Sequence, residues 1–230
     1  MMTKDTGKRR KENILPIILG MLFIAAIVVA VLFLSKQTKE KEAQVPSPTP
    51  AAVAVDDGKL LDYEKEGIVT LADYKSFKEN GDPADTDDWE QMVWDDYIAE
   101  CKVTAYPDEL LSGAVDETRM QYESFAAVND MTYEELLESY GMDENTVNEV
   151  AKDTVKSRLV AKTIAYREGF SPSDDDKVTY LMKVMDYDEG DKDSLENLLK
   201  DYSENYGSRP MDDVYVEMAK ELLLKNNPGK

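Results

Sequence analysis

The stretch VKSRLVAKTIAYREGFSPSDDD, residues 155–176, decides the fold of this chain. Its first half repeats apolar residues at helical spacing, and the small side chains of Ala161 and Ala165 allow a neighbouring helix to approach closely. Gly169 is typical of the left-handed residue that follows the last turn of a helix, and Phe170 can pack back behind it. The stretch therefore predicts a long, closely packed helix that stops sharply before another helix begins.

The same periodicity continues on both sides, from residue 86 to residue 226. Pro107 suits the first turn of a helix, Thr132 and Glu135 form a capping box, and Gly141 ends the short helix that they begin. Asp143 can cap the long helix, and either serine of residues 171–173 can cap the helix after it. In the helix that begins at Pro107, the expected buried stripe comprises Leu111, Ala114, Val115, Thr118, Tyr122, Phe125 and Ala126. The predicted fold class is all-α.

Residues 14–34, ILPIILGMLFIAAIVVAVLFL, form a run of 21 positions without a charge. At the rise of an α-helix such a run spans about 30 Å, the thickness of a hydrocarbon core, so we expect a transmembrane helix. The preceding leader, residues 1–13, is rich in Lys and Arg, which favours a cytoplasmic N-terminus and an extracytoplasmic remainder. A cleaved signal peptide is the alternative, because Ala52-Val53-Ala54 is typical of a cleavage site, although it lies far beyond the apolar run.

The region between the apolar run and the helices predicts a spacer. Residues 35–57 combine charge, Ala and Ser with three prolines, a composition typical of an extended flexible linker. Residues 58–85 contain the short apolar piece Ile68–Leu71 and end in a turn signal, so we expect an extended lead-in and no sheet. The helical domain then covers residues 86–226, and residues 227–230 form a tail.

Charge and composition exclude several classes of function. Residues 35–230 contain 22 of the 27 Lys and Arg but 46 of the 48 Asp and Glu, a net charge of −24 that repels nucleic acid. Cys101 is the single cysteine, so an intrachain disulfide is impossible, and we expect this residue to be buried. The chain has no histidine, the commonest residue of zinc sites and proton shuttles. Asp186–Asn197 fails the calcium-loop spacing, because its Gly falls fifth and its twelfth residue is Asn.

Several short motifs follow one another in an order that resembles a known family. They are YPDELL at residues 106–111, MTYEELL at residues 131–137, YGMD at residues 140–143, IAYREGFSPSD at residues 164–174 and YG at residues 206–207. Together they resemble the C-terminal, peptide-binding chaperone domain of bacterial trigger factor over residues 86–226. The resemblance implies helical arms around a cradle that holds unfolded or nascent polypeptides without ATP or another cofactor.

Two departures from that family bear on function. The ribosome-docking signature is missing, and an expected membrane anchor stands in its place. Only 32 residues separate Tyr74 from Pro107, too few for the FKBP-type isomerase domain that full-length relatives carry there. The sequence thus favours a single-pass protein of a bacterial cell membrane, with an extracellular domain that binds unfolded polypeptides and is not an enzyme. The alternatives are a prolyl isomerase-family protein and a helical scaffold for one dedicated cell-envelope partner.

No catalytic, cofactor-binding or metal-binding residues are predicted. A surface that holds many sequences needs adaptable thioether and aromatic side chains, although ordinary core packing is the commoner role of any one of them. The short helix at residues 132–141 is the expected arm tip, and helix residues 120–125 could continue its surface. The candidate client-binding residues are Met120, Tyr122, Phe125, Met131, Tyr133, Leu137, Tyr140 and Met142.

Overall fold

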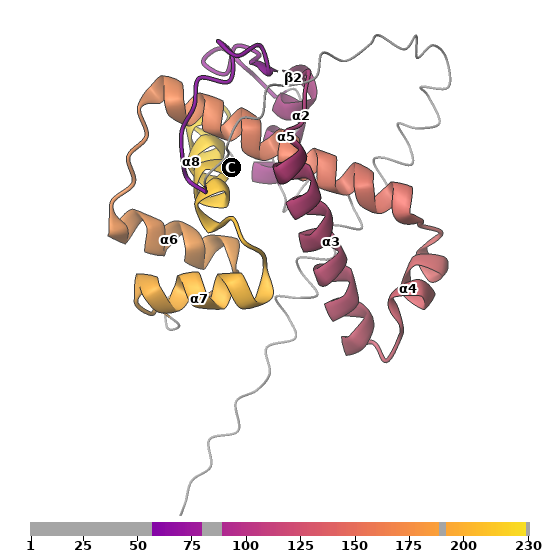
Figure 1. The fold of residues 1–230 in the computed structure, drawn as a ribbon. Coiled ribbons are helices and arrows are strands. Elements are labelled where there is room, and N and C mark those ends of the chain that lie inside the picture. Colours follow the sequence, from indigo (N-terminus) through magenta and orange to yellow (C-terminus); the bar gives the residue numbers. More distant parts are fainter. Residues whose placement is uncertain (1–56, 80–88, 189–191, 229–230) are drawn as a thin grey trace, which may run out of the picture. The chain divides into compact units, whose positions relative to one another are not determined.

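A computed structural model describes residues 57–79, 89–188 and 192–228, which all belong to one compact unit, residues 43–230. The unit is mostly helical, as predicted (Figure 1). Its helices are α2 (Trp89–Glu100), α3 (Asp108–Val128), α4 (Tyr133–Tyr140), α5 (Glu144–Glu168), α6 (Asp174–Val184), α7 (Leu195–Asn205) and α8 (Pro210–Leu224). Two short strands, β1 (Val69–Thr70) and β2 (Lys102–Val103), complete it.

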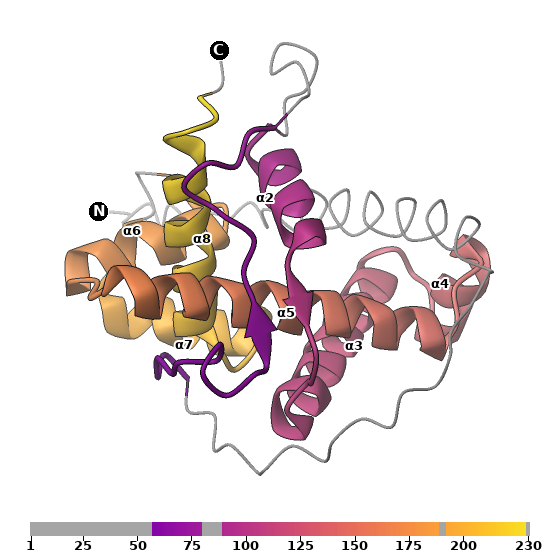
Figure 2. The ribbon, with the colours of Figure 1, turned by 90° about the horizontal axis from the view of Figure 1, so that it is seen from above.

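Helix α5 is the element around which the others are arranged. It packs most extensively against α3 and α8, and Figure 2 shows α8 crossing its C-terminal half while α3 lies beside its N-terminal half. Residues 158–165 are buried without interruption, and both Ala161 and Ala165 are fully buried, as close helix packing requires. The helix ends at Gly169 with φ of 68°, and the Phe170 amide donates to the Ala165 carbonyl at 2.9 Å.

Two apolar cores share α8. The main core lies between α5, α2, α3, α8 and the lead-in, and it includes Trp94, Tyr97 and the buried Cys101. The second core is formed by α6, α7 and the other face of α8, around Leu181, Leu198 and Val214. The expected burial of Cys101 is therefore confirmed.

The predicted helix starts are confirmed by their caps. Thr132, Asp143 and Ser173 each accept a hydrogen bond from the amide three residues later, and each of these residues completes a capping box. Gly141 adopts the left-handed conformation that ends α4. Local side-chain chemistry thus determines where the helices begin and end.

The prediction that the lead-in forms no sheet is wrong. Val69 and Thr70 pair antiparallel with Val103 and Lys102, and the Thr104 amide donates to the Ile68 carbonyl at 2.9 Å. The pairing forms because Ile68 and Val69 are buried in the main core, which holds the lead-in against the segment that leaves α2. A two-residue ladder gives no alternation in the sequence from which it could be predicted.

The expected boundary of the C-terminal tail is also wrong, because Asn227 is buried. Its side-chain amide donates to the carbonyls of Phe77 and Leu223, and its side-chain oxygen accepts from the Glu79 amide at 2.8 Å. Its own carbonyl accepts from the Trp89 indole at 2.9 Å. Asn227 therefore fastens the lead-in and α2 to the end of α8.

No helix within the described residues is long and apolar enough to cross a membrane. The expected transmembrane helix at residues 14–34, the leader before it and the spacer up to residue 56 lie outside the described residues.

We predict that Asn227→Ala lowers the free energy of unfolding by about 1–3 kcal/mol, because it removes three side-chain hydrogen bonds from a buried site. Urea denaturation followed by circular dichroism measures the change. Asn145→Ala is the matched control, since the exposed Asn145 amide bonds only to Asp143 across one turn, and its effect should stay below about 0.5 kcal/mol. Equal losses in the two variants would contradict the proposed role of Asn227.

Candidate functional site

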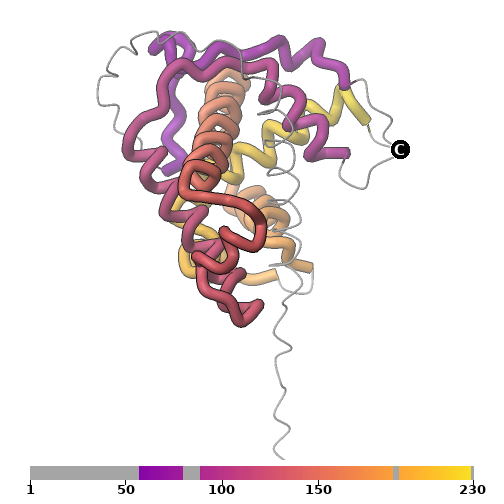
Figure 3. The backbone as a smooth tube through the Cα atoms, turned by 90° about the vertical axis from the view of Figure 1, so that its right-hand side faces the viewer, coloured from indigo at the N-terminus to yellow at the C-terminus, as the bar shows by residue number. Residues whose placement is uncertain are grey.

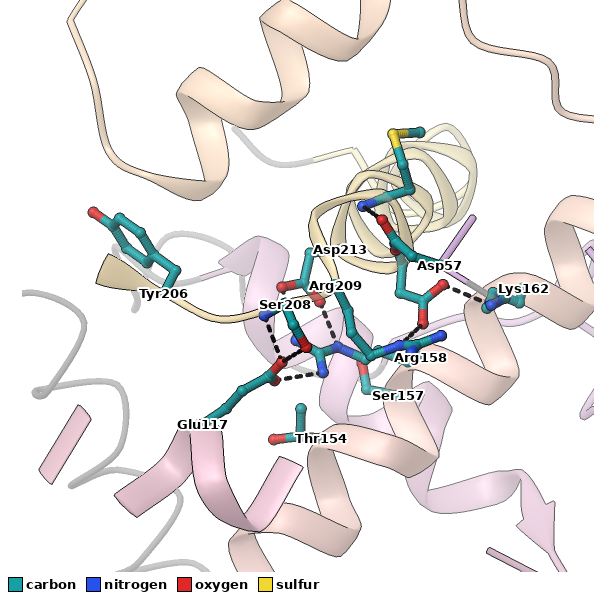
Figure 4. A network of polar contacts seen from close by, with 12 residues as sticks. Asp57, Glu117, Thr154, Ser157, Arg158, Lys162, Tyr206, Ser208, Arg209 and Asp213 are labelled. Carbon is teal, nitrogen blue, oxygen red and sulfur yellow. Dashed lines mark hydrogen bonds and ion pairs between the residues drawn. The ribbon is translucent and has the colours of Figure 1, made fainter. Parts of the chain in front are cut away.

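A buried network of charges lies where α3, α5 and α8 meet (Figure 4). Arg158 and Lys162 stand one turn apart on α5 and point inward, with exposures of 5% and 0%. Buried cations are tolerated only when they are paired and hydrogen-bonded, so each needs an acid from another element. Helix α8 supplies acids in its first turn, where negative charge also suits the helix dipole.

The pairs are short and directional. Lys162 Nζ lies 2.6 Å from Asp212 Oδ1, and the Arg158 guanidinium makes a two-pronged contact with Asp213 at 2.7 and 3.0 Å. Its third nitrogen contacts Glu117 Oε2 of α3 at 2.7 Å. One arginine therefore ties α5 to both α3 and α8, a geometry that its planar, forked donor group suits.

The loop between α7 and α8 approaches the same network. The Ser208 amide and hydroxyl donate to Glu117 Oε1, and the Tyr202 hydroxyl donates to Asp213. Gly207 has φ of 152°, and a Cβ atom there would stand 2.5 Å from the Glu117 carboxyl carbon. Glycine is thus needed at this position both for its backbone conformation and for the close approach of Glu117.

The expected end of the spacer at Asp57 is wrong, because this residue belongs to the network. The Asp57 carboxylate accepts from the backbone amides of Met211 and Asp212, at 3.5 and 3.2 Å. It therefore serves as a distant N-cap for α8, which has no side-chain cap of its own. The Gly58 amide donates to Asp212 Oδ1 at 3.2 Å, so the lead-in covers the Lys162 pair.

The network keeps the buried Asp212 ionised. Burial disfavours the charged form of Asp212, but Lys162 and Arg209 outweigh it and lower the pKa of this carboxyl below its usual 3.8. Burial likewise opposes the charge of Arg158, yet its carboxylate partners, Asp213 foremost, raise its pKa above the usual 12.5. Both groups are paired within the protein, so we assign this network a structural role.

The network was missed by the sequence analysis. The stripe expected on α3 was partly wrong, because Leu110 is buried in place of Leu111 and the stripe includes Glu117. Helical spacing places Arg158 and Lys162 on the same face of α5 as the apolar Val155 and Leu159. Two cations on a face that is otherwise buried were the available sign of a buried ion-pair network.

The candidate client-binding residues lie in a different region, which we call the arm: α3 from Met120 onward, α4, and α5 up to Val150. Figure 3 follows the chain through this region, from α3 through the short α4 into α5. The described part of the arm contributes no residue to the two apolar cores. Its buried side chains are Tyr122, Ala126, Leu136, Leu137, Val147 and Val150.

The eight candidates differ in exposure. Tyr140 is 55% exposed. Tyr122 of α3 and Leu137 of α4 are buried, and the two helices pack against each other, so the expectation that these residues add to an accessible surface is wrong. The half-buried candidates are Met120, Phe125, Met131, Tyr133 and Met142. Val128, at the end of α3, is 44% exposed and was not among the candidates.

Three polar side chains, the exposed Arg119 and Glu144 and the half-buried Tyr133, contact one another, and we call them the clasp. Arg119 of α3 pairs with Glu144 of α5 at 2.8 Å and lies over the ring of Tyr133 in α4, 5.8 Å from its centroid. The Tyr133 hydroxyl donates to the same glutamate at 3.1 Å. Such a solvent-exposed pair contributes only about 0–1 kcal/mol.

A hollow of about 650 Å³ lies along α6, away from the arm. Its lining includes Val178, Met182 and Lys183. Lys183 pairs with Glu90 and Glu217 at 2.9 Å each, so it is already neutralised. Within the described residues there is no group of three or more acids or cysteines that could hold a metal ion.

Comparison with protein families, with characterised proteins and with solved structures finds no match to this chain.

We predict that Lys162→Met lowers the free energy of unfolding by about 3–5 kcal/mol, because it removes one of the two cations that lie 2.6 Å from the buried Asp212, the other being Arg209. The matched control is Lys152→Met on the same helix, since Lys152 pairs with Glu149 at the surface and should contribute less than about 1 kcal/mol. Chemical denaturation of both variants measures the difference. A loss below 1 kcal/mol for Lys162→Met would contradict the role assigned to the network.

Proposed function

We propose that this protein is a membrane-anchored, extracytoplasmic, ATP-independent chaperone that holds unfolded or newly translocated polypeptides on its arm. The observation that supports the proposal most is the separation between the arm and the cores. Thioether and aromatic side chains of α4 and of α3 from Met120 onward stay half-exposed or exposed, and this part of the chain contributes no residue to either core. Such a surface is available to another polypeptide without disturbing the cores.

The chemistry of the arm suits a binder of many sequences. Met120, Met131 and Met142 carry flexible, polarisable thioethers, and Tyr140 offers an amphipathic ring. Residues 108–157 contain 13 Asp and Glu against 3 Lys and Arg. Like charge of this density keeps two arms apart, so apolar side chains can stay accessible without self-association.

In this proposal residues 14–34 span a bacterial cell membrane, with residues 1–13 cytoplasmic and the helical unit outside. Residues 35–56 act as the tether, and the described part of the unit begins at Asp57, which binds α8. The arrangement would hold the arm near the membrane surface, where translocated chains emerge unfolded. The resemblance of residues 86–226 to the trigger factor C-terminal domain supports the same function.

The proposed mechanism is competition with aggregation and includes no chemical step. An unfolded client exposes apolar segments that associate with one another, and reversible contact with the arm removes them from that reaction. Release needs no nucleotide, because weak apolar contacts dissociate spontaneously and free the client to fold.

A scaffold for one cell-envelope partner is the second candidate. It is favoured by the small number of large apolar side chains that are exposed in the described residues: Val128, Tyr140 and Tyr166. Photo-crosslinking from Tyr140 in cells distinguishes the candidates, because a chaperone should give many adducts and a scaffold one dominant adduct.

We predict that the full-length chain in lipid nanodiscs, at equimolar ratio, suppresses the aggregation of a reduced model protein measured by light scattering. Tyr140→Ser combined with Met142→Ser should weaken suppression several-fold, because it removes apolar contact area from the arm tip. Tyr166→Ser is the matched control, since Tyr166 is 47% exposed but lies at the far end of α5, and it should leave suppression unchanged.

Two results would count against the proposal. One is an absence of suppression across several model clients, with empty nanodiscs as the baseline. The other is an equal loss from the Tyr166 variant and the arm-tip variant, because suppression would then not depend on the arm.

A further inference from the structure

Helix α4 is held in place by few interactions. It has only eight residues, too few for an isolated helix to be stable in water, so its stability depends on packing. Its packing is small, because it buries only Leu136 and Leu137 and contacts mainly α3. Across the described residues of the unit, no other helix is this short.

The chain turns sharply on both sides of α4. Asp130, before the helix, has φ of 55°, and Gly141, after it, has φ of 65°. A residue other than glycine in this left-handed region is uncommon and costs about 1 kcal/mol. The two turns separate α4 from the long helices on either side, so α4 can rotate as a unit without unwinding α3 or α5.

A buried polar atom lies beneath α4. The Tyr122 side chain is 2% exposed, and its hydroxyl has no hydrogen-bond partner within the described residues. Burial raises the pKa of Tyr122 to about 12, and the neighbouring phenol of Tyr133 in α4 adds to the shift. Burying a hydroxyl without a partner disfavours the closed arrangement by about 1–3 kcal/mol.

The clasp provides the opposing interaction. Arg119, Tyr133 and Glu144 close α4 against α3 and α5, but two of the three side chains stand about half exposed, at 44% and 54%. Their contribution is therefore small and comparable with the penalty at Tyr122. These polar interactions therefore nearly cancel, and the burial of Leu136 and Leu137 is what keeps α4 closed.

We propose that α4 is a hinged lid, and that its opening uncovers a second, hidden apolar site on α3 and the start of α5 for an extended segment of an unfolded polypeptide. The floor of this site is the face of α3 that α4 contacts, where Tyr122 and Ala126 are buried, and beside it lie Val147 and Val150, buried at the start of α5, which packs against α3. The inference rests on the proposed holding function and extends it, because it adds a hidden site to the exposed surface of the arm.

The Tyr122 hydroxyl identifies the kind of occupant. Carbonyls in the last turn of α4 accept hydrogen bonds from Ser139, Gly141 and Met142, and no acceptor among the described residues reaches the Tyr122 hydroxyl in the closed arrangement. An extended chain presents unpaired carbonyls along its length, together with apolar side chains that can replace Leu136 and Leu137. An unfolded segment can therefore accept the hydrogen bond that the closed lid leaves unmade.

Cysteine accessibility tests the lid in the full-length chain. The native Cys101 is buried and is replaced by Ala, and single cysteines are then placed at Leu137 under the lid, at Tyr140 on the surface and at Leu159 in the core. With a maleimide, Leu137→Cys should react about ten- to a hundredfold more slowly than Tyr140→Cys. Leu159→Cys, which reacts only through unfolding, should be slower by about a further thousandfold.

A further substitution in the Leu137→Cys variant distinguishes opening of the lid from local unfolding of the whole arm. Tyr122→Phe removes the unpaired hydroxyl and should slow the labelling of Leu137→Cys by about fivefold or more. Arg119→Met breaks the clasp and should accelerate it about two- to fivefold. Arg167→Met, which breaks a surface pair with Glu64 at the other end of α5, should change nothing. A permanently unfolded probe, reduced and carboxymethylated α-lactalbumin, should slow labelling as its concentration rises.

The proposal is overturned if Leu137→Cys reacts as slowly as Leu159→Cys, or if Tyr122→Phe leaves its rate unchanged. The proposal is also overturned if the labelling of Leu137→Cys slows as the concentration of this chain rises but does not respond to the probe. The occupant of the site would then be a second copy of the chain. If Leu137→Cys fails to fold, amide exchange of α4 in the native chain replaces the labelling, and exchange as slow as that of the core contradicts the lid. The labelling experiment needs no client, so it tests the lid separately from the holding function. If the lid opens but the chain does not suppress aggregation, the holding function is refuted and the lid is not.

Discussion

The buried ion pairs between α5 and α8 are the interaction on which the rest of the described structure depends. Lys162 and Arg158 of α5 meet Asp212 and Asp213 of α8 within 2.6–3.0 Å, and Glu117 brings α3 to the same place. Ion pairs that are out of contact with water must be complete, because removing one member leaves an uncompensated charge. They therefore fix how these three helices meet more strictly than apolar packing alone does.

That joint divides α5 into two parts with different uses. Its C-terminal half is buried in the main core and forms the ion pairs, whereas its N-terminal half belongs to the arm and packs against α3. Because α4 contributes no residue to either core, the proposed motion of α4 would leave both cores undisturbed. A stable base that carries a loosely held tip is the arrangement that reversible binding of varied polypeptides requires.

Local chemistry explains which features could be predicted from the sequence. The caps at Thr132, Asp143 and Ser173 and the glycine at residue 169 act within a few residues of themselves, so the helix boundaries follow from the sequence. The ion pairs join residues 41 to 55 positions apart, and nothing in either local stretch indicates its partner. Leu137 was misjudged for the same reason, because its burial depends on α3, which only the folded arrangement brings alongside.

Hydrogen–deuterium exchange of the full-length chain, with and without a permanently unfolded polypeptide, shows whether clients are held on the arm. Before the polypeptide is added, α4 should exchange quickly and residues 158–165 of α5 slowly. Added polypeptide should slow exchange in residues 120–142 and leave the α5–α8 joint unchanged. Slowing that is confined to α6 and α7, or the absence of any change, would contradict the claim that the arm is where clients are held.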